Sequence, residues 1–155
     1  MKTPSFGHWG RVLSTVAGLL ILSAFANPDL TLFNERSVWS GVYSNPQAER
    51  GRAAFETTCA MCHQADLSGR GSAIPALRGE AFTSGRHGET VGDLYQLIAS
   101  TMPPGRPTAL SPEGYADVVA YLLSANSFPA GEAELPHHQE TLHAIVFDQR
   151  SATAD

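Results

Sequence analysis

Two cysteines and a histidine stand together in Cys59-Ala60-Met61-Cys62-His63, and these are the only two cysteines of the 155-residue chain. Two thiols spaced three residues apart on a helical turn can each form a thioether with a haem vinyl group. A histidine directly after the second cysteine lies under the iron, where its imidazole can act as the proximal ligand. The motif therefore predicts one covalently attached haem c, held by Cys59 and Cys62, with His63 as the proximal iron ligand.

Three other uses of a Cys-x-x-Cys pair compete with this interpretation. A thioredoxin-like redox dithiol requires an adjacent strand and helix, and it leaves His63 without a role. A structural zinc site requires two further ligands at a familiar spacing, which the other histidines do not offer. A disulfide between residues three apart is strained and closes almost no loop. The histidines considered for the zinc site are His87, His137, His138 and His143.

Met102 is the leading candidate for the distal iron ligand. It lies 39 residues after His63 and directly before the double proline 103–104, which favours an extended backbone that can turn the thioether inward. Of the other methionines, Met1 leaves with the predicted export signal and Met61 lies inside the haem motif. Histidine with methionine is an established axial pair in c-type haem proteins, so we expect Met102 to bind the iron.

Two alternatives to Met102 stay open at this point. A methionine can fill a gap in an apolar core without touching a cofactor. His87 is the one histidine between the haem motif and Met102, but it lies between Arg86 and Gly88 in a segment that predicts a surface loop. A solvated side chain is expected there, and the same holds for the histidines of the C-terminal tail.

Pro75 and Leu77 follow His63 by 12 and 14 residues. A proline lacks an N–H group but keeps its carbonyl, which can accept the second imidazole N–H and fix the ring. Leu77 is then placed to pack on the haem edge. Both residues are predicted to form part of the haem environment.

The first 26 residues have the pattern of an export signal. Lys2 and Arg11 give a positive start, residues 12–25 form an apolar run, and residues 24–26 have the small-x-small form of a cleavage site, so cleavage is expected after Ala26. A run of about 14 residues is short for a membrane span, which needs about 20. An uncleaved anchor is the alternative. The predicted location is the periplasm, without stable membrane insertion after cleavage.

The chain that follows the signal is acidic. It holds eight arginines, no lysine and fifteen acids, which gives a formal net charge of −7. Phosphates would be repelled by such a surface, so nucleic acid is excluded as a partner. The absence of lysine also excludes a lysine ring around the haem edge as the docking device.

The segments that must position the site read as helices, and no segment shows strand alternation. An extended lead-in, residues 27–44, precedes a helix that begins at Asn45, the expected cap, and runs through Phe55 into the haem motif. Gly51 lies in the interior of this helix, where a glycine costs about 1 kcal/mol relative to alanine. Such a glycine indicates that another helix crosses closely at that point.

Two more helices carry clear start signals. Thr90 and Asp93 have the spacing of a capping box, and the helix they open must end near Thr101 because prolines follow. Its predicted buried face consists of Leu94, Leu97 and Ile98. The last strong helix begins at Ser111-Pro112, and its apolar residues recur at helical spacing. Those residues are Tyr115, Val118, Val119, Leu122 and Leu123.

These observations predict a single all-α domain wrapped around one haem. Its expected bounds are 45–131, followed by a tail, residues 132–155, that packs on the domain or extends from it. The stretch 46–126 resembles a class I c-type cytochrome with one His/Met-ligated haem. In that family a glycine and an aromatic residue precede the first haem cysteine by eight and four positions. An aromatic residue of the C-terminal helix packs against them, and the matching residues here are Gly51, Phe55 and Tyr121.

The resemblance also implies roles for single residues and for partners. Pro75 matches the proline that orients the proximal histidine, and Met102 matches the distal ligand. Segments 37–43, 101–104, 128–131 and 134–136 are similar to those of bacterial cytochromes associated with quinoprotein (PQQ-dependent) dehydrogenases. This similarity implies a dehydrogenase as electron donor and a terminal oxidase or another cytochrome as acceptor.

The predicted function is therefore periplasmic transfer of single electrons, with no catalytic residues. Other functions are a haem subunit of an oxidoreductase complex, a haem peroxidase or a gas sensor. The last two need an open distal site, and a peroxidase also needs an acid–base group beside it, for which the sequence places no histidine or arginine convincingly. A Cys-x-x-Cys module without haem is the remaining alternative.

Overall fold

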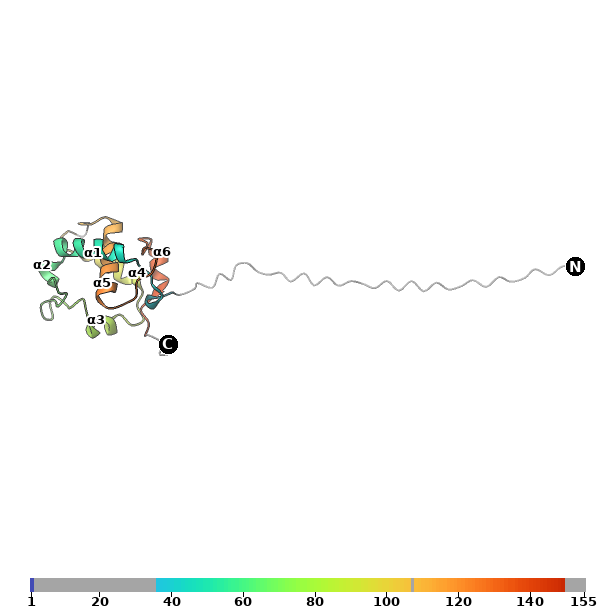
Figure 1. Ribbon diagram of the computed structural model, residues 1–155, viewed down its shortest axis with the longest axis horizontal. Helices are drawn as coiled ribbons and strands as arrows, with labels where there is room; N and C mark the ends of the chain where they lie inside the picture. The colour runs from blue at the N-terminus through green and yellow to red at the C-terminus, as the bar shows by residue number, and fades with distance from the viewer. Residues whose placement is uncertain (2–35, 107, 150–155) are drawn as a thin grey trace. The chain divides into compact units, whose positions relative to one another are not determined.

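The computed structural model describes Met1, residues 36–106 and residues 108–149. The predicted export signal and residues 27–35 of the lead-in lie outside the described residues, apart from Met1. The described part is all-α, as the sequence predicts, with one small sheet (Figure 1). The helices are α1 (Asn45–Thr58), α2 (Ala60–His63), α3 (Glu80–Gly85), α4 (Val91–Thr101), α5 (Pro112–Ala125) and α6 (Gln139–His143), with a 3-10 turn η1 (Val38–Ser40).

Helix α1 begins at Asn45, but its cap is Ser44 rather than Asn45. The Ser44 backbone is extended, and its hydroxyl accepts the Gln47 N–H at 3.3 Å. Serine at this position satisfies one of the N–H groups that a helix start leaves without a partner. Asn45 therefore lies inside the first turn, and the expected cap was wrong by one residue.

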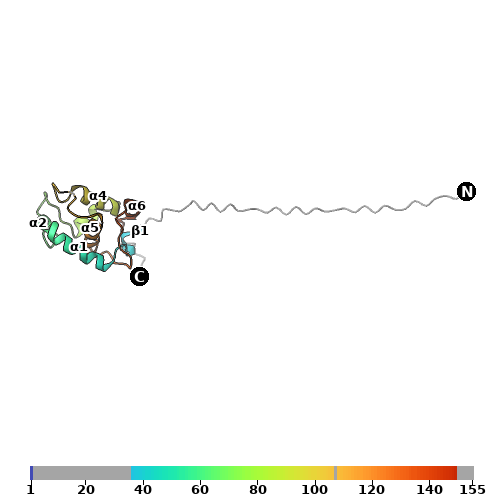
Figure 2. The ribbon, with the colours of Figure 1, turned by 90° about the horizontal axis from the view of Figure 1, so that it is seen from above.

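The close crossing that Gly51 indicates is present between α1 and α5 (Figures 1 and 2). A Cβ atom built on Gly51 would lie 1.8 Å from the carbonyl oxygen of Asp117, so only glycine fits there. One turn further on, the rings of Phe55 and Tyr121 meet with centroids 5.4 Å apart. This crossing fixes the end of α1, and with it the start of the haem motif, against α5.

Helix α4 forms where the sequence predicts it. Thr90 and Asp93 make both hydrogen bonds of the capping box, and the helix ends at Thr101, directly before Met102. Leu94 is buried, as predicted. Leu97 is 46% exposed, so the prediction that it belongs to the buried face was wrong. Its side chain lines the pocket described below instead of packing against another helix.

Helix α5 is the central element of the core. The Ser111 hydroxyl caps it by accepting the Gly114 N–H at 3.2 Å. All five apolar positions predicted for its buried face are at most 4% exposed. The chain leaves the helix at Asn126, and the following Ser127 has a positive φ of 64°.

The described part of the tail returns across the domain. Two short strands, β1 (Arg36–Ser37) and β2 (Ile145–Val146), pair in parallel, with Arg36 opposite Ile145 and Ser37 opposite Val146. Strands of two residues are too short to show alternation, which is why no sequence pattern predicted them. Four apolar side chains of the tail are buried, namely Leu135, Leu142, Ile145 and Phe147.

A buried amide also ties the tail to α1. The Gln47 side chain donates to the Leu135 carbonyl at 2.9 Å and accepts the Leu135 N–H at 2.7 Å. Nearby, Arg50 forms ion pairs with both Asp117 of α5 and Glu134 of the tail, at 3.0 Å each. Within the described residues, no helix is long and apolar enough to cross a membrane.

Candidate haem site

The haem motif lies at the junction of α1 and α2. The Cys59 N–H continues the hydrogen-bond pattern of α1 by donating to the Phe55 carbonyl at 2.8 Å. The Cys59 carbonyl accepts the His63 N–H at 3.0 Å. The short helix turns Cys59, Cys62 and His63 toward one pocket. Both thiols are free, and burial raises the pKa of Cys59, with a smaller contribution from the nearby Cys62.

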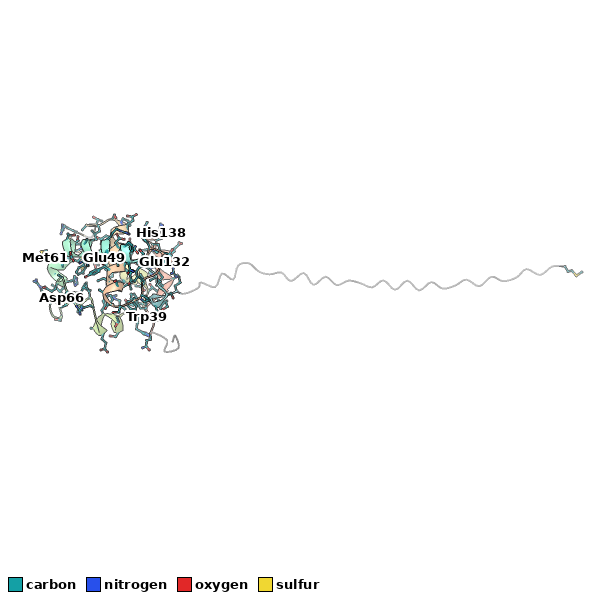
Figure 3. All side chains as sticks on the ribbon, in the orientation of Figure 1. Trp39, Glu49, Met61, Asp66, Glu132 and His138 are labelled. Carbon is teal, nitrogen blue, oxygen red and sulfur yellow. The ribbon has the colours of Figure 1, made fainter. Side chains whose placement is uncertain are left out.

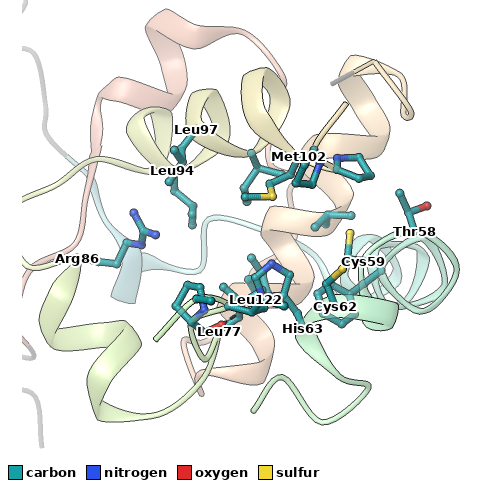
Figure 4. A pocket seen from close by; sticks show the side chains of 18 residues that line it. Thr58, Cys59, Cys62, His63, Leu77, Arg86, Leu94, Leu97, Met102 and Leu122 are labelled. Atoms are coloured by element: carbon teal, nitrogen blue, oxygen red, sulfur yellow. Dashed lines mark hydrogen bonds between the residues drawn. The ribbon is translucent and has the colours of Figure 1, made fainter. Parts of the chain in front are cut away.

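The pocket is walled mainly by apolar side chains from α1, α4, α5 and the two loops beside them (Figure 4). Such walls suit a flat aromatic macrocycle, because they remove its apolar surface from water. The described lining residues are Phe55, Thr58, Cys59, Cys62, His63, Ala73, Ile74, Pro75, Leu77, Arg86, Leu94, Leu97, Ile98, Met102, Pro103, Pro104, Val118 and Leu122.

The His63 ring is fixed by the loop that follows it. The Pro75 carbonyl oxygen lies 3.2 Å from His63 Nδ1. Because a carbonyl can only accept, this contact places the proton on Nδ1 and leaves the lone pair of Nε2 free for a metal. The residues thus fit a histidine that binds a metal through Nε2 while its Nδ1–H donates to the Pro75 carbonyl.

Gly69 lets that loop close, a requirement that sequence reasoning missed. Gly69 has φ of +68°, and a Cβ atom there would lie 2.3 Å from the Ile74 oxygen and 2.6 Å from the Pro75 oxygen. Its N–H donates to the His63 carbonyl at 3.0 Å. A glycine in this position indicates a turn. No sequence pattern, however, shows that Gly69 packs against Pro75, six residues later.

Leu77 lines the pocket from the end of the same loop. Asn126, just after α5, holds this stretch by donating to the Leu77 carbonyl at 3.0 Å and accepting the Gly79 N–H at 2.9 Å. Sequence reasoning missed Asn126 as well, because its partners lie almost fifty residues away.

Met102 lies across the pocket from His63. Figure 4 shows the Met102 thioether and the His63 ring on facing walls, with Cys59 and Cys62 along one edge between them. The Met102 backbone is extended and its N–H still donates to Ile98 at 2.9 Å. Its carbonyl accepts the hydroxyl of the buried Tyr115 at 3.1 Å, a positioning contact that the sequence did not indicate.

The competing ligands lie elsewhere. Met61 is 78% exposed and points away from the body of the domain (Figure 3). His87 lines a separate hollow beside Trp39. In the tail, His137 approaches Glu113 at 3.7 Å, and His143 Nδ1 lies 2.9 Å from the Thr90 hydroxyl. Among the described residues, His63 is therefore the one histidine that lines the pocket.

The alternatives to haem attachment find no support in this geometry. No three His, Cys, Asp or Glu side chains among the described residues are grouped so that they could hold a metal ion, as a zinc site would require. The motif follows a helix, not the strand that a thioredoxin-like dithiol needs. Two thiols on one edge, an imidazole and a thioether on facing walls, and an apolar interior together fit a c-type haem.

Comparison with known proteins points the same way. Residues 46–122 match the family model described as cytochrome c oxidase, cbb3-type, subunit III. No curated protein and no solved structure matches the chain. The matched region runs from the first turn of α1 into α5 and contains the haem motif, the pocket walls and the helix crossing. The match of residues 46–122 supports a class I c-type cytochrome domain, a haem-based electron carrier whose cofactor is covalently bound haem c.

Proposed function

We propose that this protein is a periplasmic monohaem cytochrome that carries single electrons from a dehydrogenase to a respiratory acceptor. Cys59 and Cys62 would anchor the haem, and His63 and Met102 would bind its iron. The observation that carries the proposal is the placement of His63 and Met102 on facing walls of one apolar pocket that has both cysteines along its edge. When bound, the haem iron would take up and release one electron.

The surrounding residues hold both ligands in place. Pro75 fixes the imidazole of His63 through its carbonyl, and Tyr115 holds the backbone of Met102. If both the imidazole and the thioether bind the iron, a substrate would find no open coordination position. This pair also favours a higher reduction potential than two histidines do. The residues therefore support electron transfer without bond chemistry at the metal.

The optical spectrum of the purified protein, with two methionine variants, tests the ligand assignment. The ferric wild type should show the near-infrared band of iron bound to a thioether. Met102→Ala should lose this band and lower the reduction potential, whereas Met61→Ala, a matched control at an exposed position, should keep both. An unchanged spectrum and potential in Met102→Ala would refute Met102 as ligand.

The same preparations separate this function from its competitors. Rapid peroxide turnover by the wild type would favour a peroxidase, and carbon monoxide binding to the reduced protein at neutral pH would favour a gas sensor. A colourless protein without covalent modification would exclude haem altogether. A closed electron carrier should show none of these three results.

The location and the partners rest on the sequence. The export signal in residues 1–26 supports a periplasmic protein, and the acidic chain that follows supports a partner other than nucleic acid. The flanking segments support a quinoprotein dehydrogenase as donor. Mass spectrometry of the mature protein should find Asn27 as the first residue and one haem added.

Stopped-flow measurement of reduction by a quinoprotein dehydrogenase tests the donor. A reduction rate no faster than that with an unrelated dehydrogenase would refute it.

A further inference from the structure

The end of α5 carries a half-buried amide, that of Asn126, which binds three backbone groups. Its Nδ2 donates to the Leu122 carbonyl at 2.8 Å and to the Leu77 carbonyl at 3.0 Å. Its Oδ1 accepts the Gly79 N–H at 2.9 Å. These groups require two donors and one acceptor from a single side chain, which an amide supplies and a carboxylate or a hydroxyl does not. The amide therefore ties residues 77–79 to the last turn of α5.

The segment that Asn126 holds is the far end of the loop that carries Pro75. The near end of this loop continues directly from His63. At the far end, Leu77 is bound through both of its backbone groups. Its N–H donates to the Leu67 carbonyl at 2.9 Å, and its carbonyl accepts from the Asn126 amide. Pro75 lies two residues before Leu77, so the position of the Pro75 carbonyl depends on this anchor.

The contact between Pro75 and His63 is sensitive to small movements of the loop. The distance of 3.2 Å from the Pro75 carbonyl oxygen to His63 Nδ1 lies at the long end of the range for an N–H···O hydrogen bond. A displacement of about 0.4 Å away from the ring would bring these atoms to about 3.6 Å, where no hydrogen bond forms. A backbone anchor two residues away therefore decides whether this bond is kept.

We propose that Asn126 is a positioning residue for the proximal ligand, which holds the Pro75 carbonyl on His63 and thereby lowers the reduction potential of the protein. The inference rests on the proposed function, in which His63 binds the iron. A histidine ligand becomes more basic when its other ring nitrogen donates a hydrogen bond. A more basic ligand stabilises the ferric state, so loss of the Asn126 amide should weaken the hydrogen bond and raise the reduction potential.

Two variants that each remove an amide separate this role from general stability. Gln47→Ala is the matched control for Asn126→Ala, because the Gln47 amide also binds backbone groups, those of Leu135, and lies outside the pocket lining. In the ferrous holoprotein with ¹⁵N-labelled histidine, solvent exchange of the His63 Nδ1–H should be about fivefold faster in Asn126→Ala than in the wild type, the factor that corresponds to the net loss of one hydrogen bond. The reduction potential of Asn126→Ala should rise. Gln47→Ala should change neither quantity, although both variants should unfold at lower urea concentrations.

Asn126→Asp gives a second comparison with a side chain of the same shape, which keeps the test available if Asn126→Ala yields no holoprotein. Its carboxylate accepts the Gly79 N–H but cannot donate to Leu77, so exchange at His63 should again be faster than in the wild type. Exchange rates in both Asn126 variants equal to that of Gln47→Ala, with an unchanged potential in Asn126→Ala, would overturn the proposal. All variants should keep the c-type reduced spectrum. A wild type without this spectrum would refute the proposed function instead, so the two failures are distinct.

Discussion

Tyr115 connects the central helix α5 to the backbone of the proposed distal ligand. Its hydroxyl donates to the Met102 carbonyl at 3.1 Å, and the residue is only 4% exposed. Tyr115→Phe removes this donor and keeps the ring in the core. We expect the segment around Met102 to be held less firmly, so that an external ligand displaces the thioether more easily.

The size of the effect follows from the hydrogen bond to the Met102 carbonyl that is lost. A hydrogen bond of this kind contributes about 1 kcal/mol net. Since 1.4 kcal/mol corresponds to a factor of ten, 1 kcal/mol changes the displacement equilibrium about fivefold. We therefore expect the concentration of imidazole that displaces half of the Met102 thioether to fall about fivefold in Tyr115→Phe.

Imidazole titration of the ferric holoprotein measures this equilibrium through loss of the near-infrared thioether band. Tyr95→Phe is a matched control, because Tyr95 is also buried and its hydroxyl also donates to a backbone carbonyl, that of Pro112 at 3.2 Å. Both variants should lose similar global stability in urea. Only Tyr115→Phe should bind imidazole more tightly.

Two results would refute this reasoning. If both tyrosine variants bind imidazole equally tightly, the effect comes from general loosening of the domain and not from the contact with Met102. If Tyr115→Phe loses stability in urea but its imidazole affinity stays unchanged, the hydrogen bond stabilises the fold without controlling the ligand. Either result would remove Tyr115 from the positioning of the haem site.

Three further predictions concern the frame around the site. Gly51→Ala should lower the free energy of unfolding in urea by about 3 kcal/mol, because its Cβ would overlap the Asp117 carbonyl; a loss below about 1 kcal/mol would show that the crossing relaxes. Gln47→Ala should cost about 2 kcal/mol and expose the tail to limited proteolysis, since two buried backbone groups lose their partner; an unchanged cleavage pattern would contradict this. Arg50 holds the pKa of Glu134 below its ordinary value of 4.5, so this pair stabilises the fold above that pH and the gain is lost as pH falls below it. Melting temperatures should therefore drop less on acidification in Arg50→Gln than in the wild type, and equal drops would exclude a contribution from the pair.

The chemistry of the haem motif and the helices that carry it could be predicted from local sequence. The spacing of Cys59, Cys62 and His63 is a property of one helical turn, so it needed no tertiary information to predict haem attachment. Capping signals act over three residues, which is why the start of α4 and of α5 could be predicted. Gly51 indicated a helix crossing because a glycine inside a helix is unfavourable unless a close approach requires it.

The distant residues that support the site could be identified only in the folded chain. Tyr115 and Asn126 act through backbone groups 13 and 49 residues away, and such contacts leave no local pattern in the chain. In the sequence, Arg86 is one polar residue in a glycine-rich segment. In the folded chain it lines the pocket, at the end opposite the cysteines. The tail sequence is likewise polar and irregular, yet four of its apolar side chains are buried and its backbone pairs with the segment at Gly88 and Glu89. Helices and covalent motifs depend on neighbours in sequence, whereas the walls of a pocket depend on neighbours in space, so only the folded chain reveals them.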